Sequence, residues 1–320
     1  MGLGKTNPLS RQIKGSTHEV LLALHHHVAK VLRYLCHVTW RELQQAFLLA
    51  RSHFQDSEAR AQWRLWIDAQ TGLSPGRLYL EGGRPASNEV LQAFTAHASA
   101  LNSAMPIQQI LGFEYFDDLK IHLNCHVLIP RPETIELVAL AAERLPKAAR
   151  VLDLGTGSGC IALALKNRRP DLSITGIDLS PLALEVAVQN AVMLGLDLRF
   201  IEADLRDDPS DSLQADAILC NPPYISPEEY LEVEVVEFEP SLALYAPSGD
   251  PLFYYRRALA WARVLGANQV GFECHRDRVG DVAQLAQSLG YQTQEIQDQF
   301  ASPRWVWAQN PGSQALPLKA

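Results

Sequence analysis

The sequence lacks any long apolar run, and none of its runs approaches the ~20 residues that a helix needs to cross a bilayer. A signal peptide has a basic start followed by a compact apolar stretch that ends in a small-residue cleavage site. The first residues include the basic Lys5 but no such apolar stretch. We therefore expect a protein that has no membrane span and no membrane partner.

Cysteine is scarce, and no two cysteines form a C-x-x-C pair. The five are scattered: Cys36, Cys125, Cys160, Cys220 and Cys274. An odd, dispersed set argues against a disulfide framework and against a zinc site. Three consecutive histidines at residues 25–27 would splay over about 200° of a helix and could not face one metal. We expect no metal site, and the cytoplasm as the location.

Lysine and arginine are absent from residues 207–255, although the net charge of the whole chain is −8. Glutamates crowd part of this segment: Glu228, Glu229, Glu232, Glu234, Glu237 and Glu239. Binding to a nucleic acid backbone relies on Lys and Arg, so this flank would repel one. A solvated acidic face would leave the same pattern, and both interpretations argue against direct binding to nucleic acid.

The 320 residues suggest about two domains of ~150 residues each. Helical apolar spacing covers residues 18–38, 40–54, 57–70 and 88–101, with Asn88 as a candidate N-cap. We predict an N-terminal extension over 1–38 and a helical domain over 39–105. Residues 107–120 and 121–129 then look like two strands with an Asp-Asp turn, a β-hairpin that connects the domains within 106–132.

Short apolar strands alternate with helices over residues 133–310, before a tail at 311–320. The predicted strands cover residues 150–154, 174–178, 198–202, 215–220, 269–273, 291–294 and 304–308. A helix at 181–194 has Pro181 near its first turn. Such alternation predicts an α/β fold, a doubly wound and mostly parallel seven-stranded sheet of Rossmann-like type. Its last two strands would form an antiparallel hairpin at one edge.

A glycine-rich loop, DLGTGSG, follows the first sheet strand, with glycines at Gly155, Gly157 and Gly159 and with Thr156 and Ser158 between them. Glycines allow a sharp turn and a close approach to a ligand, and the next helix would aim its first N–H groups at that ligand. The dinucleotide fingerprint needs Gly or Ala at the position of Cys160. The spacing therefore favours a methionine-derived nucleoside cofactor.

Two acidic residues strengthen this interpretation. Asp178 ends the second strand, where its carboxylate can accept hydrogen bonds from both ribose hydroxyls. It could instead cap the next helix, although Ser180 could fill that role. Asp204 follows the third strand and could accept from the adenine amino group, while Leu205 could pack on the ring. Asp204 could equally be an ordinary loop carboxylate.

The segment Asn221-Pro222-Pro223-Tyr224 closes the fourth strand. Two prolines fix φ and remove two N–H donors, which leaves backbone carbonyls free to accept. A planar NH2 group needs two acceptors in one plane, and the Asn221 side-chain oxygen and the Pro222 carbonyl can supply them. Tyr224 can stack on the flat substrate. We therefore predict methylation of a planar nitrogen here, with Asn221, Pro222 and Tyr224 as the catalytic residues.

A third motif, IPRPET at residues 129–134, places Arg131 and Glu133 around a rigid proline pair just before the sheet. They could line the substrate entrance, or form a salt bridge between the domains.

Together, IPRPET, DLGTGSG and NPPY resemble the protein glutamine N5-methyltransferases that act on peptide chain release factors. Residues 106–115 and the stretch FEPSLAL at 238–244 match the same family, so the resemblance runs from about residue 40 to 308. It implies a helical substrate-binding domain, a hairpin and a class I methyltransferase domain. It also implies methyl transfer from S-adenosyl-L-methionine to the glutamine N5 of the Gly-Gly-Gln motif, which modulates translation termination.

By motif position, the resemblance implies that Gly155 to Gly159, Asp178, Leu205 and Asn221 bind the cofactor. It implies that residues 221–224 hold the glutamine. We expect a monomer. The sequence departs from the family at Leu205, where an aromatic residue is usual, and at residues 273–275 (ECH). Residues 1–38 match nothing in the family, and we expect the natural start near Val38; a native mass that includes Met1 to His37 would contradict this.

Other functions remain open at this point. One is glutamine methylation of a large-subunit ribosomal protein, although that sister family usually carries Arg-Ser-Pro at the position of residues 131–133. Another is adenine-N6 methylation of nucleic acid, which uses the same Asn-Pro-Pro device. A non-catalytic cofactor-binding module and a nicotinamide oxidoreductase fit less well, the latter because of Cys160.

Overall fold

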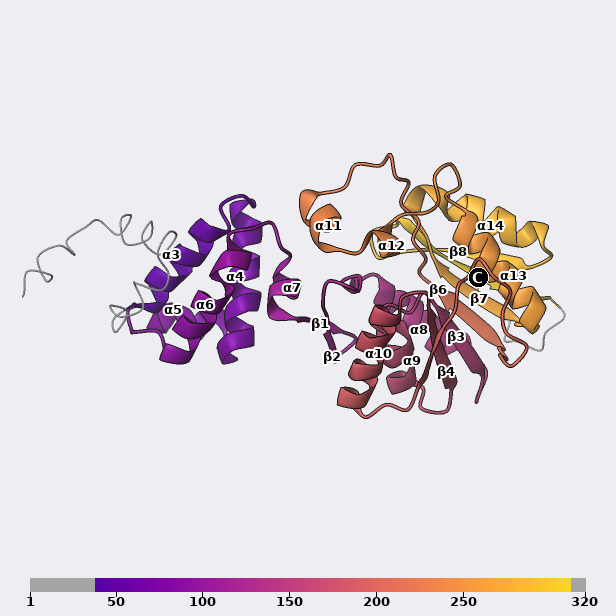
Figure 1. The fold of residues 1–320 in the computed structure, drawn as a ribbon, viewed down its shortest axis with the longest axis horizontal. Helices are drawn as coiled ribbons and strands as arrows, with labels where there is room; N and C mark the ends of the chain where they lie inside the picture. The colour runs from indigo at the N-terminus through magenta and orange to yellow at the C-terminus, as the bar shows by residue number, and fades with distance from the viewer. Residues whose placement is uncertain (1–37, 312–320) are drawn as a thin grey trace, which may run out of the picture. The chain divides into compact units, whose positions relative to one another are not determined.

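The computed structural model describes residues 38–311. The chain forms two compact units that divide between Leu111 and Gly112, and each is described by itself (Figure 1). The predicted helix at 18–38, its histidines and the expected start near Val38 lie outside the described residues except for Val38 itself. The predicted tail is described only at residue 311.

Over its described residues, 38–111, the first unit forms five helices: α3 (Trp40–Ala50), α4 (Asp56–Thr71), α5 (Pro75–Glu81), α6 (Asn88–Leu101) and α7 (Ile107–Leu111). α3 begins with a capping box between Thr39 and Glu42. The prediction that Asn88 caps α6 is wrong. Ser87 is the cap, because its hydroxyl accepts from the Val90 N–H at 3.4 Å.

A buried arginine connects the end of α6 to the start of α7. Arg51 has no exposed surface, and its guanidinium donates to Gln62 Oε1 at 2.6 Å. It also donates to the carbonyls of Leu101, Ser103 and Met105 at 3.4, 2.8 and 2.9 Å. These bonds satisfy backbone acceptors that the loop after α6 would otherwise leave unpaired in the core. The guanidinium therefore holds the last helix of the unit against the others.

The predicted first strand of the hairpin is wrong over residues 107–111, which form α7. Ile107 and Ile110 are both buried in the helical core, and their spacing of three residues fits one face of a helix. The hairpin itself is shorter than expected, with β1 (Phe113–Phe116) antiparallel to β2 (Leu119–His122). The predicted Asp-Asp turn is confirmed, since Asp117 and Asp118 have φ angles of 49° and 64°, as a type I′ turn requires.

Asn190 fastens the hairpin to the rest of the second unit. Its side chain is fully buried, and its Oδ1 accepts from the His122 N–H at 2.8 Å. Its Nδ2 donates to the His122 carbonyl at 3.1 Å and to the Ser158 carbonyl at 3.0 Å. One amide thus links β2 to the glycine-rich loop, and the end of the hairpin is placed next to the predicted cofactor site.

The second unit alternates strands and helices, as predicted. Its sheet contains β3 (Arg150–Leu154), β4 (Ser173–Asp178), β5 (Arg199–Glu202), β6 (Ala217–Cys220), β7 (Gln269–Glu273), β8 (Gln292–Gln297) and β9 (Pro303–Gln309). Its helices are α8 (Thr134–Arg144), α9 (Cys160–Arg168), α10 (Pro181–Leu194), α11 (Val233–Phe238), α12 (Ser241–Leu244), α13 (Phe253–Leu265) and α14 (Val279–Ser288), with a 3-10 turn η3 (Arg276–Arg278). The strand order is β5-β4-β3-β6-β7-β9-β8. β9 pairs antiparallel with both neighbours, so the predicted seven-stranded, mostly parallel sheet with an antiparallel edge hairpin is confirmed.

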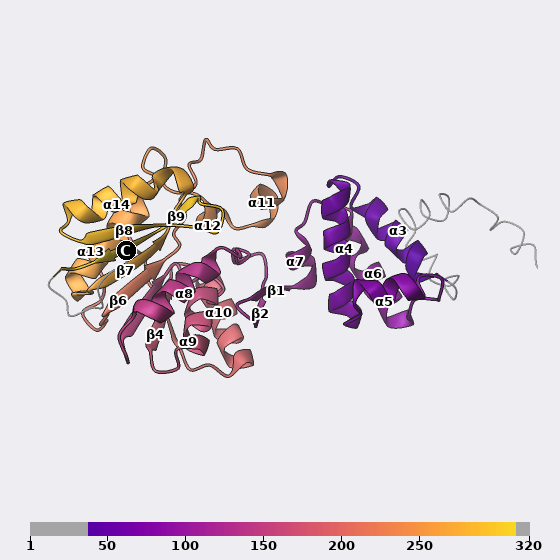
Figure 2. The same cartoon turned by 180° about the vertical axis from the view of Figure 1, so that it is seen from behind.

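Helices cover both faces of this sheet (Figures 1 and 2). Successive residues of β3 face opposite sides: Val151 packs in a core with α8, α9 and α10, whereas Leu152 packs in a core with α13 and α14. Strands buried on both faces explain why their sequences read as continuous apolar runs.

The strand order reverses between β3 and β6. The chain leaves β3 for β4 and β5 on one side and later returns to β6 on the other. The register pairs Leu154 with Cys220, so the residues that follow them, Gly155 and Asn221, emerge side by side. In open α/β sheets, ligands bind at such a point beyond the carboxyl ends of the strands.

Candidate active site

The glycine-rich loop leaves β3 in a conformation that L-residues rarely adopt. Gly155, Gly157 and Gly159 have φ angles of 72°, 54° and 81°. The N–H groups of Gly155 and Thr156 both donate to the Ile177 carbonyl, at 2.8 and 2.9 Å. These bonds fix the loop against the end of β4. A left-handed backbone at three nearby positions explains the need for glycine.

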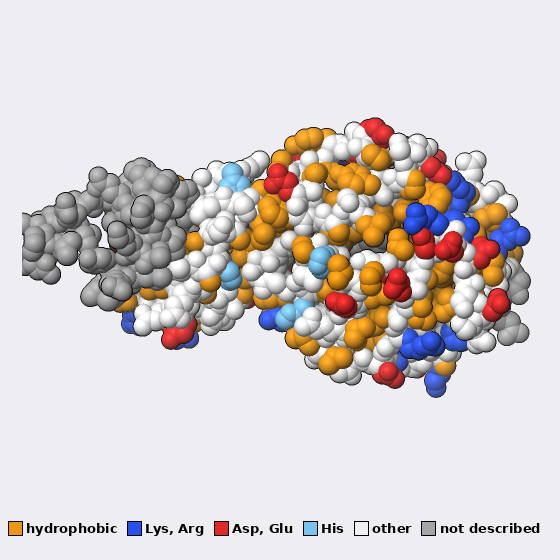
Figure 3. Space-filling model, viewed as in Figure 1, with side chains coloured by type: hydrophobic (Ala, Val, Ile, Leu, Met, Phe, Trp, Pro, Cys, Tyr) orange, Lys and Arg blue, Asp and Glu red, His pale blue; other side chains and the backbone are white. Residues whose placement is uncertain are grey.

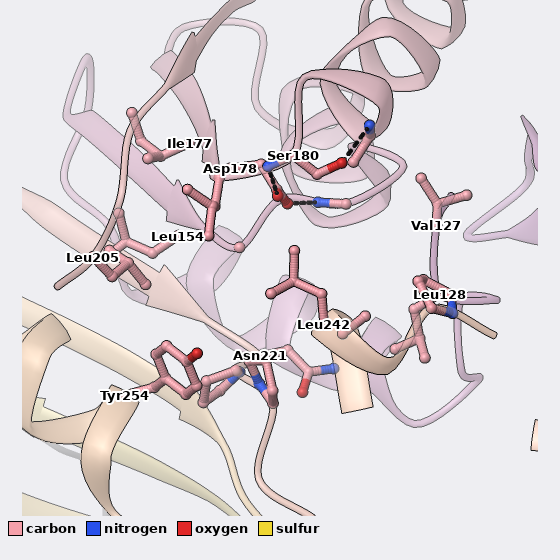
Figure 4. A pocket seen from close by; sticks show the side chains of 18 of the residues that line it. Val127, Leu128, Leu154, Ile177, Asp178, Ser180, Leu205, Asn221, Leu242 and Tyr254 are labelled. Atoms are coloured by element: carbon pink, nitrogen blue, oxygen red, sulfur yellow. Dashed lines mark hydrogen bonds between the residues drawn. The ribbon is translucent and has the colours of Figure 1, made fainter. Parts of the chain in front are cut away.

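Asp178 is held by the backbone at both carboxylate oxygens. Its Oδ2 accepts from the Gly157 N–H at 2.8 Å and its Oδ1 from the Ser180 N–H at 2.9 Å (Figure 4). Burial raises the pKa of Asp178, while these backbone bonds act in the opposite direction. The helix cap is Ser180, whose hydroxyl accepts from the Ala183 N–H. Asp178 is therefore not needed as a cap, and its remaining lone pairs are available to a ligand.

A pocket lies beyond the carboxyl ends of these strands. Of the predicted cofactor residues it is lined by Gly155, Gly157, Asp178, Asp204, Leu205 and Asn221. Thr156, Ser158 and Gly159 do not line it. The Thr156 hydroxyl points inward and donates to the buried Asp153 Oδ2 at 2.6 Å, and Ser158 is also buried. The loop thus presents the backbone of Gly155 and Gly157 to the pocket, while the Thr156 side chain holds the loop to Asp153.

Several pocket residues were not expected from the sequence as site residues. They are mainly apolar: Val127, Leu128, Leu154, Ile177, Leu242 and Tyr254 (Figure 4). Leu242 belongs to the FEPSLAL stretch at 238–244 that matches the family, and this match could have indicated a place in the site. Tyr254 lies at the start of α13, and nothing in the local sequence marked it. Such walls suit the flat, apolar faces of a nucleoside.

Asp204 and Leu205 lie at the rim of the pocket with partners of their own. Arg206 Nε donates to Asp204 Oδ2 at 2.8 Å, and this hydrogen bond is the largest cause that lowers the pKa of Asp204. Arg257 Nε donates to the Leu205 carbonyl at 2.6 Å. The backbone at Leu205 is therefore anchored to α13, and its side chain lines the pocket.

Asn221, Pro222 and Pro223 line the pocket opposite the glycine loop, whereas Tyr224 does not. The Asn221 Nδ2 donates to the Thr134 Oγ1 at 3.4 Å. The Tyr224 ring packs beside His275, with ring centres 6.0 Å apart. The motif therefore turns at its prolines: Asn221 faces the predicted cofactor side, and Tyr224 faces a different part of the unit.

Arg131 forms a salt bridge within the second unit, so the expectation of a salt bridge between domains is wrong. Arg131 donates to Glu239 Oε1 at 2.5 Å, and the Ile129 N–H donates to Glu239 Oε2 at 3.0 Å. The Glu239 side chain is only 1% exposed. Losing either hydrogen bond would leave a buried carboxylate oxygen unpaired, which is costly in free energy. The two hydrogen bonds join IPRPET to the FEP stretch. Glu133 directly precedes α8, and neither Arg131 nor Glu133 lines the pocket.

Two buried carboxyl groups flank the pocket, and sequence reasoning assigned neither of them a role. Asp153 lies beneath the glycine loop, and burial raises its pKa to about 7. Glu273 ends β7 and is 1% exposed, and burial raises its pKa to about 7 as well. The strand pattern correctly predicted that both residues lie in strands. Apolar neighbours in the sequence do not reveal that a buried carboxyl group has an oxygen without a hydrogen-bond partner.

The acidic segment includes α11 and the loop before it. Figure 3 shows a mixture of acidic and apolar side chains over α11. Exposed apolar residues in this segment are Tyr230, Val233 and Val236. With no Lys or Arg in residues 207–255, this surface carries negative charge, as the sequence indicated.

Among residues 38–311 the structure contains no group of three or more His, Cys, Asp or Glu side chains that could hold a metal ion. The four cysteines in this range are free. No helix in the same range is long and apolar enough to cross a membrane.

The residues of the pocket fit S-adenosyl-L-methionine. The space next to Gly155 and Gly157, where a Cβ would stand, holds no atom within 4 Å, so the loop leaves room for a ligand close to its backbone. Asp178 presents a carboxylate that two backbone N–H groups hold in place, and most of the walls around it are apolar. The lining of this pocket includes His126 but no Lys or Arg side chain.

Comparison with known proteins agrees with this geometry. Residues 137–249 match the model of the methyltransferase small domain family. A release factor glutamine methyltransferase from Chlorobaculum tepidum is 36% identical over 258 residues, which cover 75% of this chain and 87% of that protein. One from Flavobacterium psychrophilum is 34% identical and covers 78% and 87%. One from Rhodospirillum rubrum is 36% identical over 264 residues and covers 81% of each chain.

Proposed function

The chain belongs to the family of release factor glutamine methyltransferases, and we propose that it methylates the side-chain N5 of the glutamine in the Gly-Gly-Gln motif of a peptide chain release factor. S-adenosyl-L-methionine is the methyl donor. The observation that carries this proposal is the place of Asn221. It stands next to the glycine loop at the strand-order reversal, and its amide nitrogen is turned toward Thr134.

When bound, the cofactor supplies a methyl group activated by a sulfonium sulfur. The protein holds the acceptor amide. A glutamine NH2 has two N–H donors in one plane, and in our proposal they bond to Asn221 Oδ1 and to the Pro222 carbonyl. Pro222 and Pro223 lack N–H groups, so this turn offers acceptors without competing donors. Such positioning can contribute roughly 7–11 kcal/mol of barrier reduction.

The other predicted site residues take supporting roles in this proposal. Asp178 accepts from the ribose hydroxyls, Asp204 and Leu205 lie against the base, and the loop from Gly155 to Gly159 holds the methionine part through the backbone of Gly155 and Gly157, which line the pocket. Tyr224 stacks on the glutamine amide from the side away from the pocket.

Arg131 and Glu133 shape the substrate entrance in our proposal. The pairing of Arg131 with the buried Glu239 keeps the rigid segment 129–132 in place. The helical unit, predicted over residues 39–105 and extended to Leu111 by α7, holds the body of the release factor. Residues 112–132 connect it to the methyltransferase domain over 133–310.

We further propose that the enzyme acts as a cytoplasmic monomer and does not contact nucleic acid directly. The absence of Lys and Arg from residues 207–255 beside the site supports the last point, because that surface would repel a phosphate backbone. Light scattering after size exclusion measures the oligomeric state, and a stable dimer would contradict the proposal.

The proposal is tested by offering the enzyme labelled S-adenosyl-L-methionine with three separate acceptors: a release factor, a large-subunit ribosomal protein and DNA. We expect label on the release factor, with peptide mass spectrometry placing one methyl group on the glutamine of Gly-Gly-Gln. A release factor with that glutamine changed to alanine is the matched control and should stay unlabelled. Label on the ribosomal protein or DNA instead would assign a different substrate.

A further inference from the structure

Glu273 stands directly behind Asn221. The register pairs Cys220 of β6 with Phe272 of β7, so the next residue of each strand, Asn221 and Glu273, emerge as neighbours. Glu273 is 1% exposed, and it does not line the pocket. A carboxyl group in this place is costly, because burial removes water without supplying full compensation.

The neighbours of the Glu273 carboxyl group are the same groups that hold Asn221. The Thr134 hydroxyl and the Asn221 amide both lie close enough to lower its pKa. Thr134 itself is 2% exposed and accepts from Asn221 Nδ2 at 3.4 Å. The second oxygen, Glu273 Oε2, has no hydrogen-bond partner. The three side chains therefore form one buried polar cluster on the side of Asn221 that faces away from the pocket.

We infer that Glu273, together with Thr134, is a positioning residue that fixes which way the Asn221 amide is turned. An ionised carboxylate only accepts hydrogen bonds, so it selects the orientation in which Nδ2 points to the cluster and Oδ1 points to the substrate. This inference rests on the proposed function, because only an acceptor of an NH2 group requires Oδ1 on that side.

The orientation matters because an amide turned by 180° would direct its own NH2 at the substrate NH2. Two donors would then face each other, and the hydrogen bond that positions the glutamine would be lost. A protonated Glu273 can donate as well as accept, and it would tolerate either orientation. The ionised form is therefore the one that specifies the active arrangement.

The ionisation of Glu273 falls in a useful range of pH. Burial raises its pKa to about 7, so activity should rise with pH through neutrality as the carboxylate forms. The other titratable or charged groups that face it are Arg304, Glu133, Tyr224, Cys274 and Cys160. Burial raises the pKa of Cys160 to about 12 and those of Tyr224 and Cys274 above their ordinary values, so none of these three titrates near pH 7.

The first test compares Glu273→Gln with Glu295→Gln, the same chemical change on the exposed face of edge strand β8. With a release factor that the wild type methylates, we expect Glu273→Gln to lower kcat roughly tenfold to hundredfold and to leave KM for the cofactor unchanged. The rise of kcat through pH 7 should disappear as well. Glu295→Gln should match the wild type in all three respects.

A second pair of variants separates positioning from folding. Thr134→Ser keeps the hydroxyl group and should retain kcat, whereas Thr134→Val has a similar shape and should lose it. A wild-type kcat and pH profile in Glu273→Gln, or equal loss in both Thr134 variants, would overturn the inference.

A third readout needs no substrate. In protein labelled with ¹⁵N-asparagine, the side-chain NH2 resonance of Asn221 should shift with a midpoint near pH 7, because Glu273 ionises beside it. Asn221→Ala identifies the resonance, and Glu273→Gln should abolish the shift. An Asn221 resonance that does not titrate would sink the inference even if the enzyme methylates its release factor. Failure of wild-type methylation with a normal titration would instead refute only the proposed substrate.

Discussion

The two halves of the pocket are built in different ways. The glycine-loop half comes from a nearly continuous stretch, Asp153 to Ser180, whose backbone N–H groups hold Asp178 and the loop. The asparagine half is assembled from segments far apart in the chain, since Thr134, Asn221 and Glu273 meet only in the folded protein. In our proposal the first half can therefore specify cofactor binding locally, while the second depends on tertiary packing to orient Asn221, the proposed acceptor of the substrate amide.

The largest expected effect is a separation of turnover from cofactor binding at Asn221. We expect Asn221→Ala to lower kcat roughly 10²–10³-fold, as removal of one preorganised hydrogen-bonding group does elsewhere. The dissociation constant for S-adenosyl-L-methionine, measured by calorimetry, should change little, because Asp178 and the loop remain. A near-normal kcat would remove the proposed acceptor role.

The reverse pattern is expected at Asp178. Asp178→Ala should weaken cofactor binding roughly tenfold to hundredfold, because charge-assisted hydrogen bonds are worth about 1.5–3 kcal/mol. At saturating cofactor, kcat should stay close to the wild-type value. Asp211→Ala, which removes an exposed carboxylate, is the control for the charge alone. If Asp178→Ala and Asn221→Ala each impaired both quantities equally, the two halves would have to be regarded as one unit.

A third test probes how tightly the loop half is packed. A Cβ at Gly159 would lie 3.1 Å from Leu163 Cδ1 and 3.2 Å from Ala187 Cβ, whereas one at Gly195 would meet nothing within 4 Å. Both glycines have positive φ, so Ala at either site incurs a left-handed penalty of about 1–2 kcal/mol. We expect Gly159→Ala to lower the free energy of unfolding by roughly 1 kcal/mol more than Gly195→Ala, as urea denaturation can measure. Equal losses of unfolding free energy in the two variants would mean that α9 and α10 shift at little cost to accommodate the added Cβ.

A fourth prediction concerns the pH dependence of stability, which the two halves share. Asp153 and Glu273 both have a pKa raised to about 7 by burial, so the folded state binds their protons more tightly than the unfolded state. The free energy of unfolding should therefore fall as pH rises from about 4.5 to about 7, by at most about 1.4 kcal/mol per pH unit for each group. Asp153→Asn should reduce that slope in urea titrations, and an unchanged slope would count against the burial argument.

Much of this architecture was predictable from local patterns. The helix Pro181–Leu194 and the strand Gln269–Glu273 have the predicted bounds. Pro181 and Gly195 mark the ends of the helix, and a short apolar run marks the strand. Residues 107–111 were mistaken for strand because a short apolar segment does not distinguish the two structures. Their burial in the helical core decided the outcome.

The candidate site was predictable to a similar degree. The Gly155, Gly157, Asp178 and Asn221 positions line one pocket, because each follows a strand and parallel strands end at one edge of the sheet. The partner of Arg131 was not predictable, since Glu239 lies far along the chain. Tyr254 reaches the pocket through the packing of α13 against β6 and β7, and Leu242 lines it from α12.

The sequence by itself determined which chemical groups stand at the strand ends, because glycine, proline and carboxylate impose their geometry and hydrogen bonding locally. Only the tertiary structure decided which of those groups are buried away from water and which of them contact one another. Desolvation is a property of the whole packed unit, and it set the raised pKa values of Asp153 and Glu273. The direction in which the Asn221 amide points follows from that same packing.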